Sequence, residues 1–278
     1  MAGAPTAASP PPGVVERLAP LVVDPATTAV ITDYDGTLAP IVDDPELAVP
    51  LAGAPDLLVR LAGKYAVVAV VSGRSVAFLR EHLGRCDPVR LVGLYGLEWS
   101  RPGGGVVPEP GAERWRPVIA DAAARLSAGA PPGVEVERKG LAVTVHWRRA
   151  PLAADWVAGE VGSVAARGGL RAHPGRMSVE LRAPSEMDKG AATRRLVEGC
   201  TAACFVGDDL GDLPAFAALH ALAAETGLAA VAVAVTDAES APEVAAAADV
   251  AVPGPPGALS LLGWLADGAW TDTTPVTG

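Results

Sequence analysis

The sequence predicts an α/β protein in which a doubly wound parallel-sheet core carries a smaller inserted α+β unit. Short runs of β-branched residues alternate with helix-like segments in both halves of the chain, which is typical of a parallel sheet wrapped by helices. The clearest run, AVVAVV at residues 66–71, has no polar residue and is expected to form a strand buried on both faces. In the middle of the chain the alternation gives way to paired strand-like runs, which indicate the inserted unit.

The first half of the core is expected to hold three strands separated by two helices. The first strand ends in acidic residues and Gly36, and the second ends at Ser72-Gly73-Arg74. The expected strands are 28–33, 66–71 and 90–94, and the expected helices are 52–62 and 75–83.

The inserted unit follows a Gly- and Pro-rich stretch at 102–110, which we expect to act as a hinge. Two helices and four strands are expected within it, with a turn at Lys139-Gly140 joining one strand pair. The expected helices are 113–126 and 152–166, and the expected strands are 134–137, 141–147, 170–173 and 177–181.

Strand and helix alternate again after Pro184, so the second half of the core is expected to return to the same sheet. The expected strands are 203–206, 229–235 and 250–252, and the expected helices are 189–198, 213–224, 242–248 and 258–266. We therefore assign the core to residues 14–106 and 185–270, and the inserted unit to residues 107–184. Residues 1–13 lack the features of a signal peptide and are expected to be a flexible leader, and the polar residues 271–278 a flexible tail.

Composition excludes several classes of function. Of the 278 residues, 50% are hydrophobic, which is enough for a sizeable core and excludes wholesale disorder. The net charge of -10 argues against a general nucleic-acid binder or a protein of anionic membrane surfaces. The most apolar stretch, 215–235, contains His220, Glu225 and Gly227, which excludes a membrane-spanning helix there. Three cysteines are too few for a disulfide scaffold. Taken together, these features lead us to expect a soluble, cytoplasmic protein that binds neither nucleic acid nor membrane.

Four polar clusters lie where the loops of a parallel sheet form its ligand-binding crevice. They are Asp33-Tyr34-Asp35-Gly36-Thr37, Ser72-Gly73-Arg74, Asp188-Lys189-Gly190 and Gly207-Asp208-Asp209-Leu210-Gly211-Asp212. Taken singly, the first is also compatible with a turn and the last with a helix cap. Together and in this order they predict one shared site.

The acidic residues of this site predict a bound metal ion. Asp33 and Asp35 lie two residues apart after one strand, and Asp208, Asp209 and Asp212 follow another. Carboxylates this close repel one another, so their joint ionisation requires a cation. An oxygen-rich donor set without a histidine cluster favours Mg²⁺ over Zn²⁺ or iron.

The same site has the groups that phosphoryl transfer needs. A carboxylate can attack phosphorus and form an aspartyl-phosphate, which divides one difficult displacement into two easier ones. Lys189 supplies a positive charge at a helix start, and Ser72 and the Gly73 amide supply hydrogen-bond donors for phosphoryl oxygens. The four clusters therefore predict a phosphoryl-transfer enzyme.

These clusters resemble the four motifs of the haloacid-dehalogenase-type phosphohydrolases, and longer runs resemble the trehalose-6-phosphate phosphatases among them. The runs are DYDGTLAPIVDDP at 33–45, VSGR at 71–74, GLYGLEW at 93–99, KGLAVTVHWR at 139–148 and MSVELRAP at 177–184. The similarity covers roughly residues 29–266, and the inserted unit lies where the superfamily carries a type-two cap. We call the inserted unit the cap from here on.

The resemblance implies Mg²⁺-dependent hydrolysis of trehalose 6-phosphate to trehalose and phosphate, and a functional link to the synthase that makes this substrate. It implies that Asp33 is the nucleophile and that Asp35 is the general acid/base. The implied metal ligands are Asp33, the Asp35 carbonyl and Asp208, with Asp209 and Asp212 orienting waters or Lys189. The implied phosphate-binding residues are Ser72, Gly73 and Lys189.

Sugar recognition is expected from side chains beyond the four motifs, because those motifs face mainly the phosphate. Arg74 is expected to reach either the phosphate or the sugar. The other candidates are Glu98, Lys139, His146, Arg148, Arg176, Glu180 and Arg182. Strand alternation places His146 and Arg148 on one face, and likewise Arg176, Glu180 and Arg182, although a solvated charged face is the alternative for each set.

The chain departs from the family pattern in the fourth motif. It reads GDDLGDLPAF at 207–216, where the family often reads GDDxTDEDAF. Gly211 therefore replaces a threonine, and Leu213-Pro214 replace two carboxylates, while Asp208, Asp209 and Asp212 are retained. We expect the metal affinity, rather than activity as such, to be affected.

Two alternatives to this function stay open. The first is the same chemistry on another sugar phosphate, of the sucrose-phosphate or mannosylglycerate-phosphate type. The second is a phosphosugar sensor without turnover, which the retention of both Asp33 and Asp35 disfavours because a sensor needs no nucleophile. A dehydrogenase is disfavoured because no GxGxxG follows the first strand.

Overall fold

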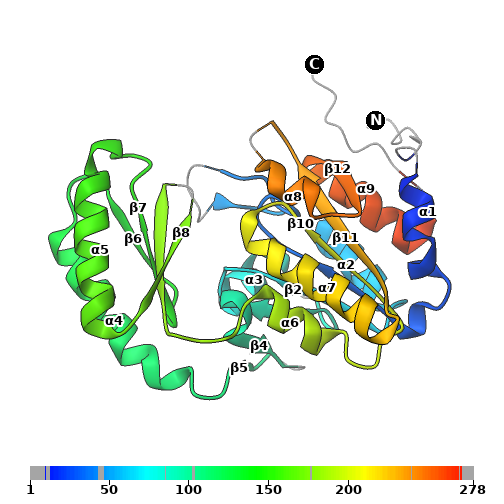
Figure 1. Cartoon of the computed structure of the whole chain (residues 1–278), viewed down its shortest axis with the longest axis horizontal. Helices are drawn as coiled ribbons and strands as arrows, with labels where there is room; N and C mark the ends of the chain where they lie inside the picture. Colours follow the sequence, from blue (N-terminus) through cyan, green and yellow to red (C-terminus); the bar gives the residue numbers. More distant parts are fainter. Residues whose placement is uncertain are drawn as a thin grey trace.

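A sheet of eight strands forms the larger part of the computed structural model (Figure 1). Its strand order is β12-β11-β10-β1-β2-β3-β4-β5, and every pair from β12 to β3 is parallel. The parallel strands are β1 (Thr28–Thr32), β2 (Val67–Val71), β3 (Arg90–Gly93), β10 (Ala202–Gly207), β11 (Ala229–Thr236) and β12 (Val250–Pro253). The antiparallel strands β4 (Glu98–Ser100) and β5 (Val106–Pro108) extend the sheet beyond β3.

Helices cover both faces of this sheet, as predicted. One face packs on α1 (Val14–Leu18), α2 (Ala54–Ala62), α3 (Val76–Leu83) and α9 (Gly254–Asp267), and the other on α6 (Lys189–Leu196), α7 (Leu213–Thr226) and α8 (Pro242–Ala246). Within β1, Val30 belongs to the first core and Ile31 to the second, and neither side chain is exposed. Burial on both faces explains why these strands are apolar throughout, since each such side chain contributes about 1.5–3 kcal/mol when buried.

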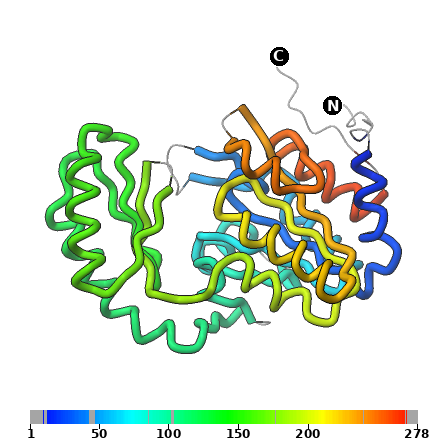
Figure 2. Tube along the Cα trace, viewed as in Figure 1, coloured from blue at the N-terminus to red at the C-terminus, as the bar shows by residue number. Residues whose placement is uncertain are grey.

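The cap is built around a separate antiparallel sheet of four strands in the order β6-β7-β9-β8. Its strands are β6 (Glu135–Arg138), β7 (Ala142–His146), β8 (Arg171–Gly175) and β9 (Ser178–Arg182). Two helices, α4 (Arg116–Gly129) and α5 (Ala154–Gly168), pack on the sheet face that is turned away from the core (Figure 1). Figure 2 shows that the chain enters the cap after β5 and returns to the core before α6. The predicted α/β core with an inserted α+β unit is therefore confirmed.

The Gly- and Pro-rich stretch at 102–110, which we expect to act as a hinge, contains a strand that the sequence did not predict. Val106–Pro108 form β5, which pairs with β4 in the main sheet, so the boundary expected at residue 107 falls inside a strand. The pairing gives hydrogen-bond partners to backbone groups of β4 that would otherwise form a bare sheet edge. Strands of three residues are too short to show a period that sequence analysis could detect.

The structure describes residues 10, 13–42, 47–84, 86–101, 104–175, 177–238, 240–268 and 270. The expected leader at 1–13 lies outside this range apart from residues 10 and 13, and the expected tail at 271–278 lies entirely outside it. Across the described residues, no helix combines the length and the apolar character needed to cross a membrane.

Candidate active site

Two acidic loops meet at the carboxyl ends of the neighbouring strands β1 and β10. Thr32 and Val206 are partners in the parallel register, so the residues that follow them emerge side by side. The backbone N–H of Asp33 donates to the Val206 carbonyl at 2.8 Å, which fixes the start of the first loop against β10. Gly36 has a φ of +70°, and a β-carbon there would lie 1.9 Å from a carboxylate oxygen of Asp208. A side chain at position 36 would therefore separate the two loops.

Lys189 lies between the carboxylates of the two loops. It is the first residue of α6, whose N-terminus is capped by the Asp188 carboxylate accepting from the Ala191 amide at 2.7 Å. Its Nζ lies 2.8 Å from Asp33 Oδ2 and 2.6 Å from Asp212 Oδ1, and its side chain is 2% exposed. Burial alone lowers the pKa of Lys189, but the charges of Asp212 and Asp33 raise it well above its usual value. The ammonium is therefore permanently charged beside Asp33.

Carboxylate oxygens of Asp33, Asp208 and Asp212 lie within 4.8 Å of one another, and a single ammonium stands against these three acidic groups. Burial and mutual repulsion raise the pKa of Asp208 to about 8 and that of Asp212 to about 6, and they raise that of Asp33 as well. The site thus has less positive than negative charge, and the atoms that could bind a metal ion are all oxygens. The residues present fit a divalent metal ion, as the sequence predicted.

Asp209 and Asp212, the other two acidic residues of the second loop, have different hydrogen-bond partners. Asp209 is exposed and accepts a hydrogen bond from the Gly211 amide at 2.8 Å, and its carboxylate is not part of the close group formed by Asp33, Asp208 and Asp212. Asp212 accepts from the amides of Asp208 and Asp209 at 2.9 and 3.1 Å as well as from Lys189. Asp212 therefore holds Lys189 and the second acidic loop in place, which is the orienting role that the resemblance implied.

The expected phosphate-binding residues lie beside Asp33 in one cavity of about 1170 Å³. Ser72 and Gly73 line it at the end of β2, and Lys189 lines it from α6. The cap sheet forms the opposite wall with Lys139, His146, Arg148 and Arg182, four of the expected sugar-binding residues. The acidic loops and the cap therefore enclose the same space.

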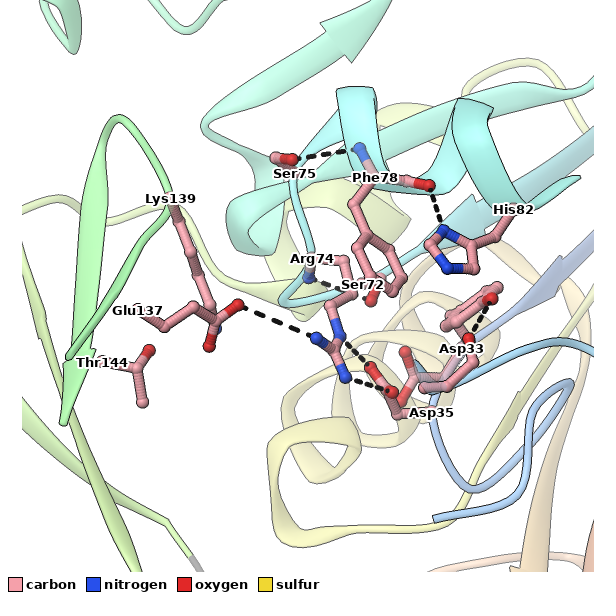
Figure 3. A network of polar contacts seen from close by, with 12 residues as sticks. Asp33, Asp35, Ser72, Arg74, Ser75, Phe78, His82, Glu137, Lys139 and Thr144 are labelled. Carbon is pink, nitrogen blue, oxygen red and sulfur yellow. Dashed lines mark hydrogen bonds and ion pairs between the residues drawn. The ribbon is translucent and has the colours of Figure 1, made fainter. Parts of the chain in front are cut away.

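Arg74 lines the cavity and pairs with Asp35 (Figure 3). Its guanidinium donates to both carboxylate oxygens of Asp35, each at 2.8 Å, and a contact with phosphate or sugar stays a prediction. A further guanidinium nitrogen lies 3.7 Å from Glu137 of the cap, and the Phe78 ring lies 4.5 Å from its central carbon. Phe78 is itself stacked on His82 at 4.0 Å between ring centroids. Arg74 thus fixes the direction of Asp35 and joins it to the cap.

Two further candidates for sugar contacts, Glu98 and Glu180, do not line the cavity. Glu98 lies outside the cavity, where its carboxylate accepts from the Val76 amide at 3.0 Å and caps α3. Glu180 is 6% exposed beneath the cavity wall, where it pairs with Lys139 at 3.1 Å and with Arg182. Neither residue lines the cavity and each carboxylate pairs with neighbouring groups of the protein, so a sugar contact from either stays a prediction. Arg176 lies outside the described residues.

Glu137 and Tyr95 line the cavity but were not among the predicted site residues. The Glu137 carboxylate is 2.9 Å from His146 and 3.5 Å from Lys139. Although burial raises the pKa of Glu137, the hydrogen bond with His146 and the charges of Lys139 and Arg74 lower it to about 2. Strand alternation relates Glu137 to Lys139, so the sequence held a signal for it, whereas nothing in the sequence indicated where Tyr95 points.

Comparison with known proteins now identifies the family. The family model for trehalose-phosphatases matches residues 31–252, which include both acidic loops and the whole cap sheet. The chain belongs to the trehalose-phosphatase family. The resemblance seen in the sequence is therefore confirmed.

Within the aligned region, relatives in the trehalose-phosphatase family are identical to this chain at about a third of the positions. The trehalose-phosphate phosphatase of Mycobacterium avium is 36% identical over 204 residues, which cover 69% of this chain and 51% of the relative. That of Mycobacterium leprae is 33% identical over 206 residues, which cover 69% of this chain and 48% of the relative. The chain thus spans about half the length of the curated relatives it matches.

Solved structures have the same fold. A trehalose-6-phosphate phosphatase related protein superposes with a TM-score of 0.71 at 25% identity, covering 85% of this chain and 95% of that one. The C-terminal domain of C. albicans trehalose-6-phosphate phosphatase gives 0.75 at 24% identity, with 93% and 99% covered. The C-terminal domain of a Candida albicans trehalose synthase regulatory protein gives 0.64 at 14% identity, with 92% and 99% covered. The two-unit architecture is thus common to these proteins.

Proposed function

We propose that this chain hydrolyses trehalose 6-phosphate to trehalose and inorganic phosphate. The observation that carries the proposal is that Asp33, held by Lys189, shares one cavity with the polar wall of the cap. One side of that cavity provides a nucleophile and cations for a phosphoryl group, and the other provides hydrogen-bonding side chains for sugar hydroxyls. The family supports the choice of trehalose 6-phosphate among sugar phosphates.

In the first proposed step, an Asp33 carboxylate oxygen attacks phosphorus and the bond from phosphorus to the sugar oxygen breaks. Asp35 gives a proton to that oxygen, so trehalose leaves as a neutral alcohol and Asp33 becomes an aspartyl-phosphate. Lys189 and the Ser72–Gly73 loop bind the phosphoryl oxygens during the transfer.

In the second proposed step, water replaces the sugar on the same side of the phosphoryl group. Asp35, now a carboxylate, takes a proton from the water as its oxygen attacks phosphorus. The bond from phosphorus to Asp33 breaks, which releases phosphate and restores both aspartates. Arg74 keeps the Asp35 carboxylate aimed at this position through its two hydrogen bonds.

The metal ion that we propose is Mg²⁺. Its ligands would be the carboxylates of Asp33 and Asp208 and the backbone carbonyl of Asp35, with Asp212 completing the close carboxylate group and Asp209 at its exposed edge orienting waters. When bound, Mg²⁺ neutralises the charge that the carboxylates and the phosphoryl oxygens bring together. The expected effect of Gly211 and Leu213-Pro214 on metal affinity stays a prediction.

We propose that the cap selects the sugar. Its cavity wall carries alternating charges, with Glu137 between Arg74, Lys139 and His146, so each group is held in place by a neighbour. Such fixed donors and acceptors discriminate between sugars, because a hydroxyl that is missing or misplaced leaves one of them unpaired.

The proposal is tested by measuring phosphate release from a panel of sugar phosphates with and without Mg²⁺. We expect trehalose 6-phosphate to give the highest kcat/KM. A higher value for a sucrose-type or mannosylglycerate-type phosphate would replace the substrate but keep the chemistry. Binding of trehalose 6-phosphate without turnover would establish a sensor instead. The cytoplasmic location and the link to the synthase stay predictions.

Asp35→Asn is expected to lower kcat on trehalose 6-phosphate at least about 100-fold, because an amide is too weak an acid to protonate the leaving sugar oxygen. An aryl phosphate whose phenolate leaves without a proton should lose much less in its first step. The measurement is the burst of phenolate release on mixing, compared with steady-state turnover of the sugar phosphate. An equally reduced burst would contradict the role of general acid.

Glu180→Gln is expected to raise KM for trehalose 6-phosphate about tenfold while leaving a small aryl phosphate nearly unchanged. The buried carboxylate holds Lys139 and Arg182 at the cavity wall, and the amide cannot neutralise them. Steady-state kinetics on both substrates provide the measurement, with exposed Glu225→Gln as the matched control. Equal losses on the two substrates would show instead that Glu180 supports the whole fold.

A further inference from the structure

Tyr95 occupies a turn that is unfavourable for residues with a β-carbon. It follows β3, and its φ of 58° and ψ of 31° lie in the left-handed region, as does the φ of 50° of Leu94. Two hydrogen bonds hold the turn against the loop after β2: the Tyr95 amide donates to the Ser72 carbonyl at 3.0 Å, and the Leu94 amide to the Arg74 carbonyl at 2.9 Å. Such backbone strain persists where the surroundings enforce it, and it is concentrated at functional sites.

The turn directs the Tyr95 side chain across the phosphate-binding loop. A methyl group at Gly73 would lie 2.5 Å from the Tyr95 hydroxyl oxygen, so the phenol lies directly against the α-carbon of Gly73. The guanidinium carbon of Arg182 lies 3.3 Å from the ring centroid and Lys189 Nζ lies 6.0 Å from it. The ring is thus fixed from two sides, by the cap through Arg182 and by the core through the turn.

The hydroxyl of Tyr95 is available to donate a hydrogen bond to a ligand in the cavity. Tyr95 lines the cavity that also holds Asp33, and its hydroxyl has no hydrogen-bond partner among the residues that the structure describes. Burial, reinforced by the nearby Glu180 charge, raises the pKa of Tyr95, so the phenol stays neutral and keeps its proton. A neutral phenol beside a lysine ammonium is suited to donate to an anion.

We infer that Tyr95 is a further catalytic residue, whose hydroxyl donates a hydrogen bond to a phosphoryl oxygen beside Gly73 and Lys189. This inference rests on the proposed phosphatase function and adds a donor that the four motifs do not include. The ring contacts Arg182 of the cap, but the hydroxyl lies against Gly73 of the phosphate-binding loop, which assigns it to the phosphoryl group and not to the sugar.

Tyr95→Phe tests the inference, because it removes the hydroxyl and keeps the ring beneath Arg182. We expect kcat/KM to fall about 10- to 100-fold, and by a similar factor for trehalose 6-phosphate and for a small aryl phosphate. We also expect the inhibition constant of inorganic phosphate to rise. The matched control is Tyr65→Phe, which removes a hydroxyl that donates to the Leu265 carbonyl at 2.9 Å far from the cavity and should leave all three values unchanged.

Unchanged kinetics and phosphate inhibition in Tyr95→Phe would overturn the inference, and so would a loss confined to trehalose 6-phosphate. The failure of the proposed function has a different signature, since the wild-type chain would then release phosphate from neither substrate. In that case calorimetric titration with inorganic phosphate still decides the matter. Weaker phosphate binding by Tyr95→Phe than by the wild type supports the inference, and equal binding overturns it.

Discussion

Asp33→Asn is expected to abolish phosphate release from every substrate. The amide is nearly the same size as the carboxylate, but its oxygen is too weak a nucleophile to form the phospho-enzyme. Asp33 is 5% exposed, lies 2.8 Å from Lys189 Nζ and lines the same cavity as Ser72. The measurement is phosphate release under single-turnover conditions, together with mass spectrometry for the 80 Da phosphoryl adduct, a mass of about one HPO₃ group.

The same variant is expected to fold at least as stably as the wild type in the absence of metal. Burial and the charges of Asp212 and Asp208 raise the pKa of Asp33, so ionised Asp33 is a cost in the folded state. Lys189 also pairs with Asp212 at 2.6 Å, a contact that does not involve Asp33. Lost activity with a retained melting temperature would separate the nucleophile from a structural residue, and Asp267→Asn at an exposed ion pair is the matched control. Near-normal turnover would remove Asp33 from the nucleophile role.

The scaffold of the site could be predicted because it depends on patterns that are local in the sequence. Continuous apolar strands predict a buried parallel sheet, and the loops after neighbouring strands must then meet at one edge. This reasoning brings Asp33 and Asp208 together before any coordinates are known, and the structure places their carboxylates in one group. The same reasoning could not find β4 and β5, because three residues are too few to establish a period.

The partners of individual side chains could not be predicted in this way. Arg74 points at Asp35 because the Phe78 ring supports its guanidinium from a neighbouring helix, which depends on side-chain conformations and not on spacing. Glu180 lies on the expected face of β9, but Lys139 and Arg182 cover that face and form ion pairs with the Glu180 carboxylate. A pattern identifies which residues share a face, while packing decides which of them reach the cavity.

Removal of metal is expected to silence the enzyme completely, and addition of Mg²⁺ to restore it. Three carboxylates around one ammonium leave the buried site short of positive charge, and a phosphoryl group would bring more negative charge to it. The measurement is phosphate release after treatment with EDTA and again after adding excess Mg²⁺. Full activity in the chelator would eliminate the proposed mechanism.

Metal binding is also expected to stabilise the fold, and more at pH 8.5 than at pH 6. Without metal, the raised pKa values of Asp208, about 8, and Asp212, about 6, mean that the folded state binds more protons than the unfolded state above pH 4. Stability from these groups is therefore present at low pH and is lost as pH rises through about 8. Mg²⁺ binds the deprotonated carboxylates, so protons compete with it least at high pH. With free Mg²⁺ at 100 times its Kd, the gain is about 2.7 kcal/mol, which thermal unfolding measures directly.

Two variants test whether the stabilisation by Mg²⁺ depends on the buried carboxylate group. Asp208→Asn should remove most of the Mg²⁺-induced rise in melting temperature, because it deletes a carboxylate of the buried group. Asp209→Asn should keep most of the rise, because that carboxylate is exposed and turned toward the Gly211 amide. The pair differs by one position in the same loop, so a general loss of loop structure would affect both alike. An equal loss of the Mg²⁺ effect in the two variants, or a larger effect at pH 6 than at pH 8.5, would contradict a metal site built on Asp33, Asp208 and Asp212.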